Sequence, residues 1–201
     1  MINNNLKQLS TERWASKVAY DNKWNERTEL LLQIAINHNL LNSINSFTEY
    51  GCGPNRPLKL LLDKINFTGK YIEADITKWR DTTKIINLNN CKNEDLEKTD
   101  CGVFSGVLEY LDDLPKLFDL IKNKHNYVLF SYSAFNPDYH SEVELLSKIQ
   151  ILSKRANSGW RNHFSLKEFL SIKTDFIVID IGYWNGQALF VLAHKNLLNL
   201  K

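Results

Sequence analysis

Two short segments carry the residue types of a nucleoside-binding pocket. The first, from Phe47 to Pro54, is an apolar run that passes through Glu49 and ends in Gly51-Cys52-Gly53. Asp75 follows Gly53 by 22 positions, at the end of a second short apolar run. A strand that leads into a glycine turn at a helix N-terminus, followed by a strand ending in a carboxylate, is typical of sites that hold a ribose diol. The spacing therefore predicts a pocket for an adenosine-containing cofactor.

The composition describes an ordinary soluble domain. A chain of 201 residues with 43% hydrophobic and 24% charged residues is long enough to bury one core without metal or disulfide links. The net charge of +2 favours neither nucleic acid nor an anionic membrane as a partner. Three cysteines without CxxC spacing, and an N-terminus without an apolar signal core, predict reduced thiols and a cytoplasmic location. We expect no metal, and a monomer or homodimer.

Hydrophobic periodicity places strands and helices in alternation. Strands are expected at 46–50, 71–75, 84–88, 101–105 and 127–132, and helical patterns at 11–41, 58–65, 114–122, 141–154 and 165–172. This alternation predicts a parallel sheet with right-handed crossovers. The C-terminal part differs, because strand-like runs at 176–184 and 187–195 are joined by Asn185-Gly186, a strong hairpin signal.

Four motifs together with the hairpin resemble class I S-adenosylmethionine-dependent methyltransferases, from about Phe47 to the end of the chain. The motifs are Glu49 to Gly53, Asp75, Phe104 to Tyr110, and Gly159 to Phe164. The last two are similar to a subgroup of bacterial surface-polysaccharide and small-molecule methyltransferases. The resemblance implies an α/β fold, a Rossmann-like seven-stranded, mostly parallel sheet with an antiparallel C-terminal hairpin strand and helices on both faces. It also implies a helical lid over residues 1–45 ahead of a methyltransferase domain over 46–201.

The resemblance implies S-adenosylmethionine as the cofactor and a set of residues that bind it. These are Glu49, Gly51, Cys52, Gly53, Asp75, Asn87, Leu88, Ser105, Gly106 and Val107. The sequence departs from the family pattern in two places. Pro54-Asn55 stands where a third glycine is expected, and Asn87 stands where an Asp often contacts the adenine amino group.

The acceptor side is expected to combine a base with polar and aromatic side chains. His163 is the candidate general base, since an unperturbed imidazole takes up a proton near neutral pH. The alternative is that His163 caps the helix near Ser165. Arg161 is expected to pair with an anionic acceptor, or else to be a solvated surface charge. The candidate substrate-binding residues are Tyr20, Arg27, Glu109, Tyr110, Tyr132, His140, Trp160, Arg161 and Asn162.

The favoured function is methyl transfer to a small acceptor, with O-methylation preferred. The expected acceptor is a sugar or phosphate-type group of a surface glycan precursor. A nicotinamide-dependent oxidoreductase is a weaker alternative, because Arg56 occupies the place of the third glycine in that fingerprint. A non-catalytic methyltransferase-like binding subunit is a second alternative. Nucleic-acid methylation is disfavoured, because Ser105-Gly-Val-Leu-Glu follows the fourth strand in place of an Asn/Asp-Pro-Pro-Tyr motif.

Overall fold

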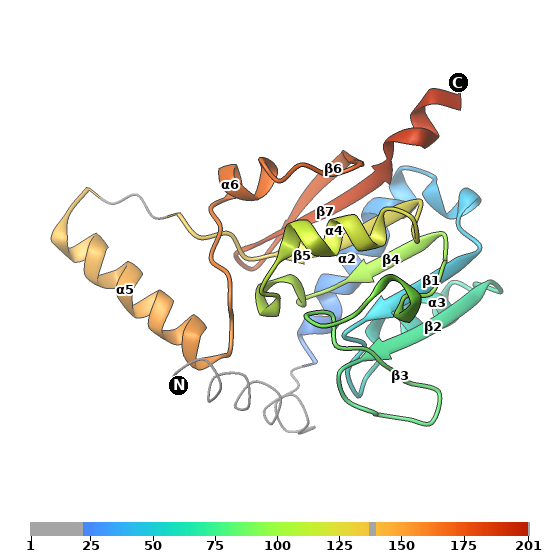
Figure 1. The fold of residues 1–201 in the computed structure, drawn as a ribbon, viewed down its shortest axis with the longest axis horizontal. Helices are drawn as coiled ribbons and strands as arrows, with labels where there is room; N and C mark the ends of the chain where they lie inside the picture. Colours follow the sequence, from blue (N-terminus) through green and yellow to red (C-terminus); the bar gives the residue numbers. More distant parts are fainter. Residues whose placement is uncertain (1–21, 137–139, 201) are drawn as a thin grey trace.

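A seven-stranded mixed sheet forms the centre of the molecule. The computed structural model describes residues 22–136 and 140–200, with strands in the order β3-β2-β1-β4-β5-β7-β6 (Figure 1). The first five strands pair in parallel, and β7 is antiparallel to both of its neighbours, β5 and β6. The predicted fold class is therefore confirmed. The strand bounds are β1 Ser46–Tyr50, β2 Lys70–Asp75, β3 Lys84–Ile85, β4 Cys101–Phe104, β5 Tyr127–Tyr132, β6 Phe176–Trp184 and β7 Gln187–His194.

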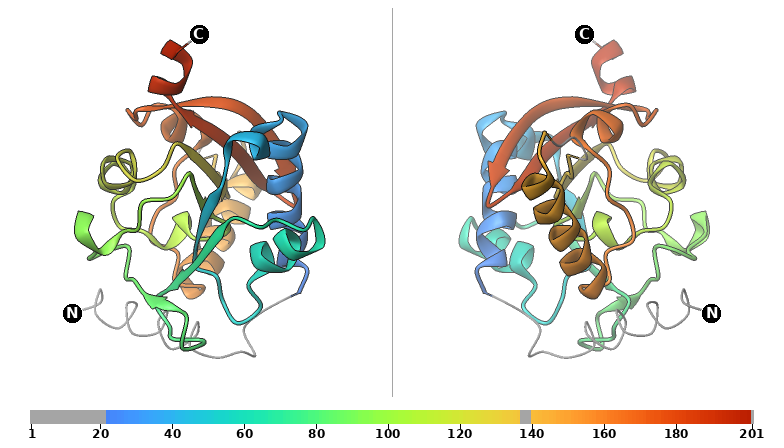
Figure 2. Two further views of the ribbon diagram at one scale, coloured as in Figure 1. Left: turned by 90° about the vertical axis from the view of Figure 1, so that its right-hand side faces the viewer. Right: turned by 90° about the vertical axis from the view of Figure 1, so that its left-hand side faces the viewer.

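Helices cover both faces of the sheet. α2 (Trp24–Asn37) and α3 (Pro57–Lys64) pack on one face, and α4 (Leu114–Ile121) and α6 (Leu166–Leu170) pack on the other (Figure 2). Short 3₁₀ turns link these elements: η2 Leu40–Ser43, η3 Asn93–Asp95, η4 Leu108–Tyr110 and η5 Lys195–Leu200. The described part of the expected lid, α2, belongs to the core on its face of the sheet, and residues 1–21 lie outside the described residues.

The hairpin that closes the sheet has the turn expected from its sequence. Asn185 and Gly186 both have positive φ, 42° and 80°, and Trp184 pairs directly with Gln187. Two consecutive positive φ values give the turn a twist that matches the right-handed twist of the flanking strands. The turn therefore inserts β7 beside β5, where Leu189, Phe190 and Val191 are fully buried.

Two local expectations are corrected by the structure. β3 is a two-residue strand rather than a run to Leu88, and the Asn87 side chain instead accepts a hydrogen bond from the backbone N–H of Asn89, 3.1 Å away. This side-chain turn competes with strand pairing. At the start of α5 (Glu142–Asn157), Ser141 followed by Glu144 predicts a capping box, and the Ser141 side chain does cap the helix. The carboxylate of Glu144, however, accepts from the His140 backbone N–H in place of that of Ser141.

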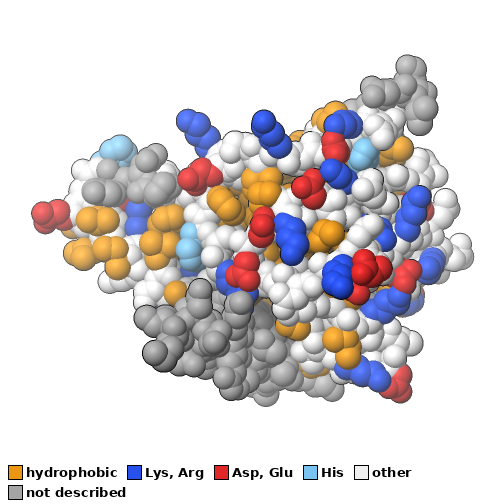
Figure 3. Space-filling view, viewed as in Figure 1, with side chains coloured by type: hydrophobic (Ala, Val, Ile, Leu, Met, Phe, Trp, Pro, Cys, Tyr) orange, Lys and Arg blue, Asp and Glu red, His pale blue; other side chains and the backbone are white. Residues whose placement is uncertain are grey.

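The helix α5 stands apart from both layers. None of its residues is buried, and Val143, Leu146, Ile149 and Ile151 are exposed on its surface. Hydrophobic side chains accordingly gather over the α5 end of the molecule in Figure 3. The three cysteines are buried and unpaired. Among the described helices, none is both long and apolar enough to cross a bilayer.

Candidate functional site

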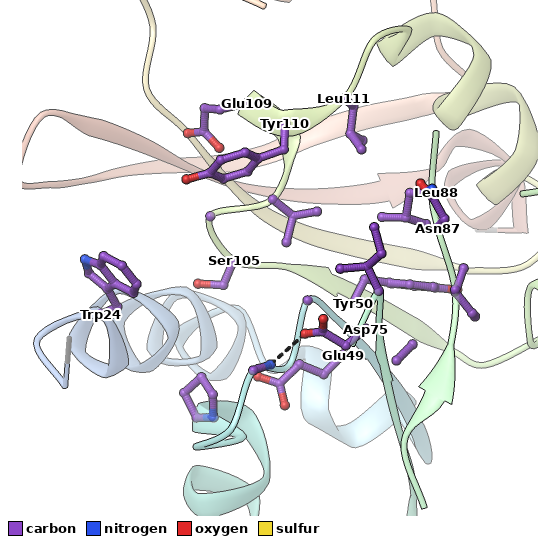
Figure 4. A pocket seen from close by; sticks show the side chains of 18 of the residues that line it. Trp24, Glu49, Tyr50, Asp75, Asn87, Leu88, Ser105, Glu109, Tyr110 and Leu111 are labelled. Carbon is purple, nitrogen blue, oxygen red and sulfur yellow. Dashed lines mark hydrogen bonds between the residues drawn. The ribbon is translucent and has the colours of Figure 1, made fainter. Parts of the chain in front are cut away.

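A cavity of about 240 Å³ lies beyond the carboxyl ends of β1, β2 and β4. In a parallel sheet, ligands bind in the crevice at this edge, where the strand order reverses. The reversal lies between β1 and β4 here, because the chain runs outward from β1 to β3 before it returns to β4. Loops from these three strands, with α2 and the hairpin, form the walls (Figure 4).

The glycine loop after β1 needs glycine for two separate reasons. Gly51 and Gly53 have φ of 68° and 61°, a conformation that other residues adopt at a steric cost. A Cβ on Gly51 would also lie 2.5 Å from Cγ2 of Val107, so the loops after β1 and β4 approach more closely than any side chain allows. The backbone N–H groups of Gly51 and Cys52 both donate to the carbonyl of Ala74, at 2.8 and 3.2 Å. The loop is thus tied to β2.

Asp75 binds this loop with one oxygen and its own turn with the other. Oδ2 accepts from the Gly53 N–H at 2.9 Å, the bond drawn in Figure 4, and Oδ1 accepts from the Thr77 N–H at 3.0 Å. The side chain is 8% exposed and lines the cavity. Burial raises the pKa of Asp75, while the two backbone hydrogen bonds act in the opposite direction. A carboxylate has about four acceptor positions, so lone pairs are left for a ligand.

Glu49 orders the helix that follows the loop. Its Oε1 accepts from the Leu58 N–H at the start of α3, at 3.0 Å, and its Oε2 accepts from the Tyr71 hydroxyl at 2.5 Å. A carboxylate at this place satisfies a helix N–H that has no partner within the helix. Burial is the main cause that raises the pKa of Glu49 to about 7. Cys52, three positions after Glu49, is fully buried and does not line the cavity.

The loop after β4 is fixed by Arg27 from α2. Nε of Arg27 donates to Oγ of Ser105 and Nη2 donates to the Ser105 carbonyl, both at 3.0 Å. Nη1 donates to Oε1 of Gln187 in the hairpin, at 3.1 Å. Gly106, with φ of 72°, lets the guanidinium pass, since a Cβ there would lie 2.2 Å from Nη2. Arg27 therefore joins an N-terminal helix, a cavity loop and the C-terminal hairpin.

The two ends of the cavity differ in chemistry. Asn87 and Leu88 lie at one end, and Glu109, Tyr110 and Trp24 lie toward the other, with Asp75 and Ser105 between them (Figure 4). Trp160 also lines the cavity, and its Nε1 donates to the Tyr110 hydroxyl at 3.0 Å. The structure thus brings together nine of the ten predicted cofactor residues. Of the predicted substrate residues, it places Arg27, Glu109, Tyr110 and Trp160 on the wall.

Several other predicted residues lie behind the wall. Asn162 is buried, where its amide donates to the carbonyls of Leu108 and Leu111 at 2.7 and 2.9 Å. The Tyr132 hydroxyl donates to Oδ1 of Asn162 at 2.7 Å. Asn162 therefore connects the segment after Trp160 to the η4 turn, and Tyr132 connects it to β5. Arg161 forms an ion pair with Asp112, with 2.6 Å between Nη1 and Oδ2.

The remaining predicted residues lie apart from the cavity wall. His140 is exposed, and Tyr20 lies outside the described residues. His163 is half-buried and is not among the lining residues. Its Nδ1 is buried without a hydrogen-bond partner in the described part of the chain. Burial, and then the positive charge of Arg155, lower the pKa of His163, which keeps the ring neutral near pH 7.

Sequence reasoning missed several wall residues. They are Trp24, Tyr50, Pro54, Pro57, Ala74, Ile76, Trp79, Ile86, Asn89, Leu111 and Gln187. Some of them could have been predicted from the sequence, because Ile76 directly follows Asp75 and Trp79 lies in the same loop. Gln187 carried no such signal, since only the hairpin brings it to the cavity. Among the described residues, no cluster of three or more His, Cys, Asp or Glu is arranged to hold a metal.

Comparison with known proteins reveals similar solved structures. No protein-family model matches the sequence, and no curated protein matches it. The plantazolicin methyltransferase BpumL, solved in complex with SAH, superposes with a TM-score of 0.60 at 13% identity, covering 96% of this chain and 99% of that one. An O-methyltransferase family protein from Burkholderia thailandensis gives 0.61 at 13% identity, covering 90% and 61%.

Larger proteins share the same core. The pyocyanin biosynthetic protein PhzM matches with a TM-score of 0.51 at 13% identity, covering 75% of this chain and 50% of its own. The chain spans about half the length of PhzM and of LaPhzM, and 42% of OxaC. These likenesses, together with the strand order and the antiparallel β7, show that the chain has the class I methyltransferase fold.

Proposed function

We propose that this protein transfers a methyl group from S-adenosylmethionine to a small acceptor, with oxygen as the favoured acceptor atom. One observation carries the proposal: the 2.9 Å bond between the Gly53 N–H and Asp75 joins the glycine loop and the acid in one cavity wall. These are the two parts that a nucleoside ligand needs, a backbone it can approach and a carboxylate for its ribose.

The residues present fit this cofactor. The unused lone pairs of Asp75 would accept from the ribose hydroxyls, in hydrogen bonds strengthened by the charge of the carboxylate. Asn87 and Leu88 would border the adenine, and the backbone at Gly51 and Gly53 would lie against the methionine part. Ser105, Gly106 and Val107 would lie beneath the ribose and the sulfur. When bound, S-adenosylmethionine supplies an activated methyl group, and the protein's own contribution is to hold two reactants in line.

The acceptor is proposed to enter at the end of the cavity that carries Glu109, Tyr110 and Trp160. The O-methyltransferases among the similar structures support oxygen as the methylated atom. His163 as general base for an acceptor that must lose a proton stays a prediction from the sequence, because the residue does not line the cavity. A surface glycan precursor as the acceptor stays a prediction from the sequence.

A binding experiment tests the proposal against its alternatives. S-adenosylhomocysteine at one hundred times its dissociation constant should stabilise the protein by about 2.7 kcal/mol, and NAD should not stabilise it. Stabilisation by NAD alone would favour the oxidoreductase. If neither ligand raises the melting temperature, the methyltransferase-like binding subunit becomes the better account.

A further inference from the structure

The cavity wall is acidic in the part of the chain that the structure describes. Its lining residues include the carboxyl groups of Glu49, Asp75 and Glu109, and Arg27 is the single cationic side chain among them. Burial raises the pKa of each of the three carboxyl groups, and an approaching anion would raise it further, so an anion finds no favourable charge among them. The wall therefore opposes the entry of a further negative charge.

Arg27 offsets this only in part, because its guanidinium group is already bound to protein oxygens. Each of its three guanidinium nitrogens donates to a protein oxygen, at 3.0 to 3.1 Å. Arg161, the other arginine expected to bind an anion, forms its ion pair with Asp112 and does not line the cavity. A phosphate would therefore compete with protein oxygens for the charge of either guanidinium group.

The acceptor end is built from fixed aromatic rings. The Tyr110 and Trp160 rings meet edge to face, with centroids 6.4 Å apart and an interplanar angle of 82°. The Arg155 guanidinium carbon lies 4.9 Å from the centroid of the Trp160 ring. The indole is thus held by a hydrogen bond at its edge and a cation at its face. A rigid aromatic wall favours a ligand with a flat, weakly polar surface.

Glu109 adds one unmet hydrogen-bond acceptor to this end. The residue is 1% exposed, and its Oε1 accepts from the Ser133 N–H at 2.8 Å. Its Oε2 is buried with no hydrogen-bond partner among the described residues. A buried oxygen without a donor is costly, so a ligand that brings a donor gains the energy of satisfying it. The Tyr110 ring lies beside this carboxylate at the same end of the cavity (Figure 4).

We propose that the acceptor carries no phosphate or carboxylate, lays a flat face on one of the two perpendicular rings of Trp160 and Tyr110, and donates an O–H or N–H to Glu109. Phenols and sugar hydroxyls share this chemistry. The inference rests on the proposed function, since it assigns the second substrate of that same cavity. It also narrows the expectation from sequence, because a sugar hydroxyl fits while a phosphate-type or nucleotide-linked acceptor does not.

Matched probes separate these possibilities. We would titrate the protein, saturated with S-adenosylhomocysteine, with p-cresol, p-tolyl phosphate and methyl glucoside, and follow binding by ligand-observed NMR. We expect p-cresol or methyl glucoside to bind at least tenfold more tightly than p-tolyl phosphate. Glu109→Gln keeps the acceptor for Ser133 and should weaken binding of the preferred probe about tenfold, the loss expected for one hydrogen bond to a charged group.

Two further variants complete the design. Trp160→Leu removes the ring without touching Glu109 and should also weaken the preferred probe. Glu142→Gln removes an exposed carboxylate on α5 and should leave every titration unchanged. The inference is overturned if p-tolyl phosphate binds as well as the tighter of the two uncharged probes. It is also overturned if neither uncharged probe binds, or if Glu109→Gln binds like the parent protein. Binding of S-adenosylhomocysteine itself is measured first on the same sample, so that a failure of that ligand to bind refutes the proposed function separately.

Discussion

Asp75→Ala gives the sharpest test of the cofactor site, because the side chain has two separable tasks. One task is structural: its oxygens accept from the N–H groups of Gly53 and Thr77, at 2.9 and 3.0 Å. The proposed task is to accept two ribose hydroxyls. Removing the carboxylate should therefore reduce both the stability of the protein and its affinity for the cofactor, by amounts that are measured independently.

The structure sets the size of each effect. Two backbone N–H groups lose their partner, which costs about 1–3 kcal/mol for each group that water does not reach. Loss of two charge-assisted ribose bonds, at about 1.5 kcal/mol each, predicts an affinity for S-adenosylhomocysteine that is roughly 100-fold weaker. Asp75→Asn keeps the size of the side chain and one acceptor oxygen, so it should recover part of the stability and little of the affinity.

Calorimetric titration and urea denaturation measure the two quantities on the same samples. Asp63→Asn, which removes an exposed carboxylate from α3, serves as the control and should bind S-adenosylhomocysteine like the parent protein. If Asp75→Ala binds the ligand with unchanged affinity while losing stability, Asp75 has only the structural task. The nucleoside assignment would then be refuted.

Three further predictions concern other parts of the site. The pKa of Glu49 is raised to about 7 in the folded protein, so this carboxyl group binds a proton more tightly there than in the unfolded chain. The contribution of Glu49 to the free energy of unfolding therefore falls as pH rises from about 5 to 8. Glu49→Gln should remove this decline, as urea denaturation at the two pH values will show. Gly106→Ala should cost about 2 kcal/mol or more, because its Cβ would meet Arg27. Gly186→Ala is the matched control. Gly186 has a φ of 80° and a Cβ there would meet no atom within 4 Å, so the substitution should cost about 1 kcal/mol for backbone strain alone. Equal losses of stability in the two variants would argue against the close approach of Arg27 to Gly106. His163→Ala should retain affinity for S-adenosylhomocysteine. It should lower the rate of methyl transfer from labelled S-adenosylmethionine to the probe that binds, and an unchanged rate would rule out His163 as the general base.

The strand pattern was predictable because each strand is a local, strongly apolar run. β1 and β5 begin and end where periodicity places them, and Asn185-Gly186 specifies the hairpin through its own backbone preferences. β3 was overestimated, because the sequence does not show that the Asn87 side chain turns the chain after Ile85. The cofactor residues were found since they cluster at strand ends, and the carboxyl ends of parallel strands meet at one edge of a sheet.

The acceptor side was less predictable, because its members come from distant segments whose side-chain directions depend on packing. Arg161 and Asn162 are adjacent to Trp160 in sequence, yet Asn162 points inward to the carbonyls of η4 and Arg161 to Asp112, while Trp160 lines the cavity. Gln187 and Arg27 are 160 residues apart and meet only because β7 is inserted beside β5.

The order of residue types along this chain was enough to determine three features: an alternating α/β sheet, a terminal hairpin, and a glycine loop and an acid at one edge of the sheet. These features follow from short-range backbone preferences and periodicity. The tertiary structure alone decided which charges remain free to meet a ligand. Among the described residues, Arg27, Arg155 and Arg161 each donate to a protein oxygen, while one oxygen of Glu109 and Nη1 of Arg155 have no partner, since such pairings depend on distances between side chains that only the folded chain brings together.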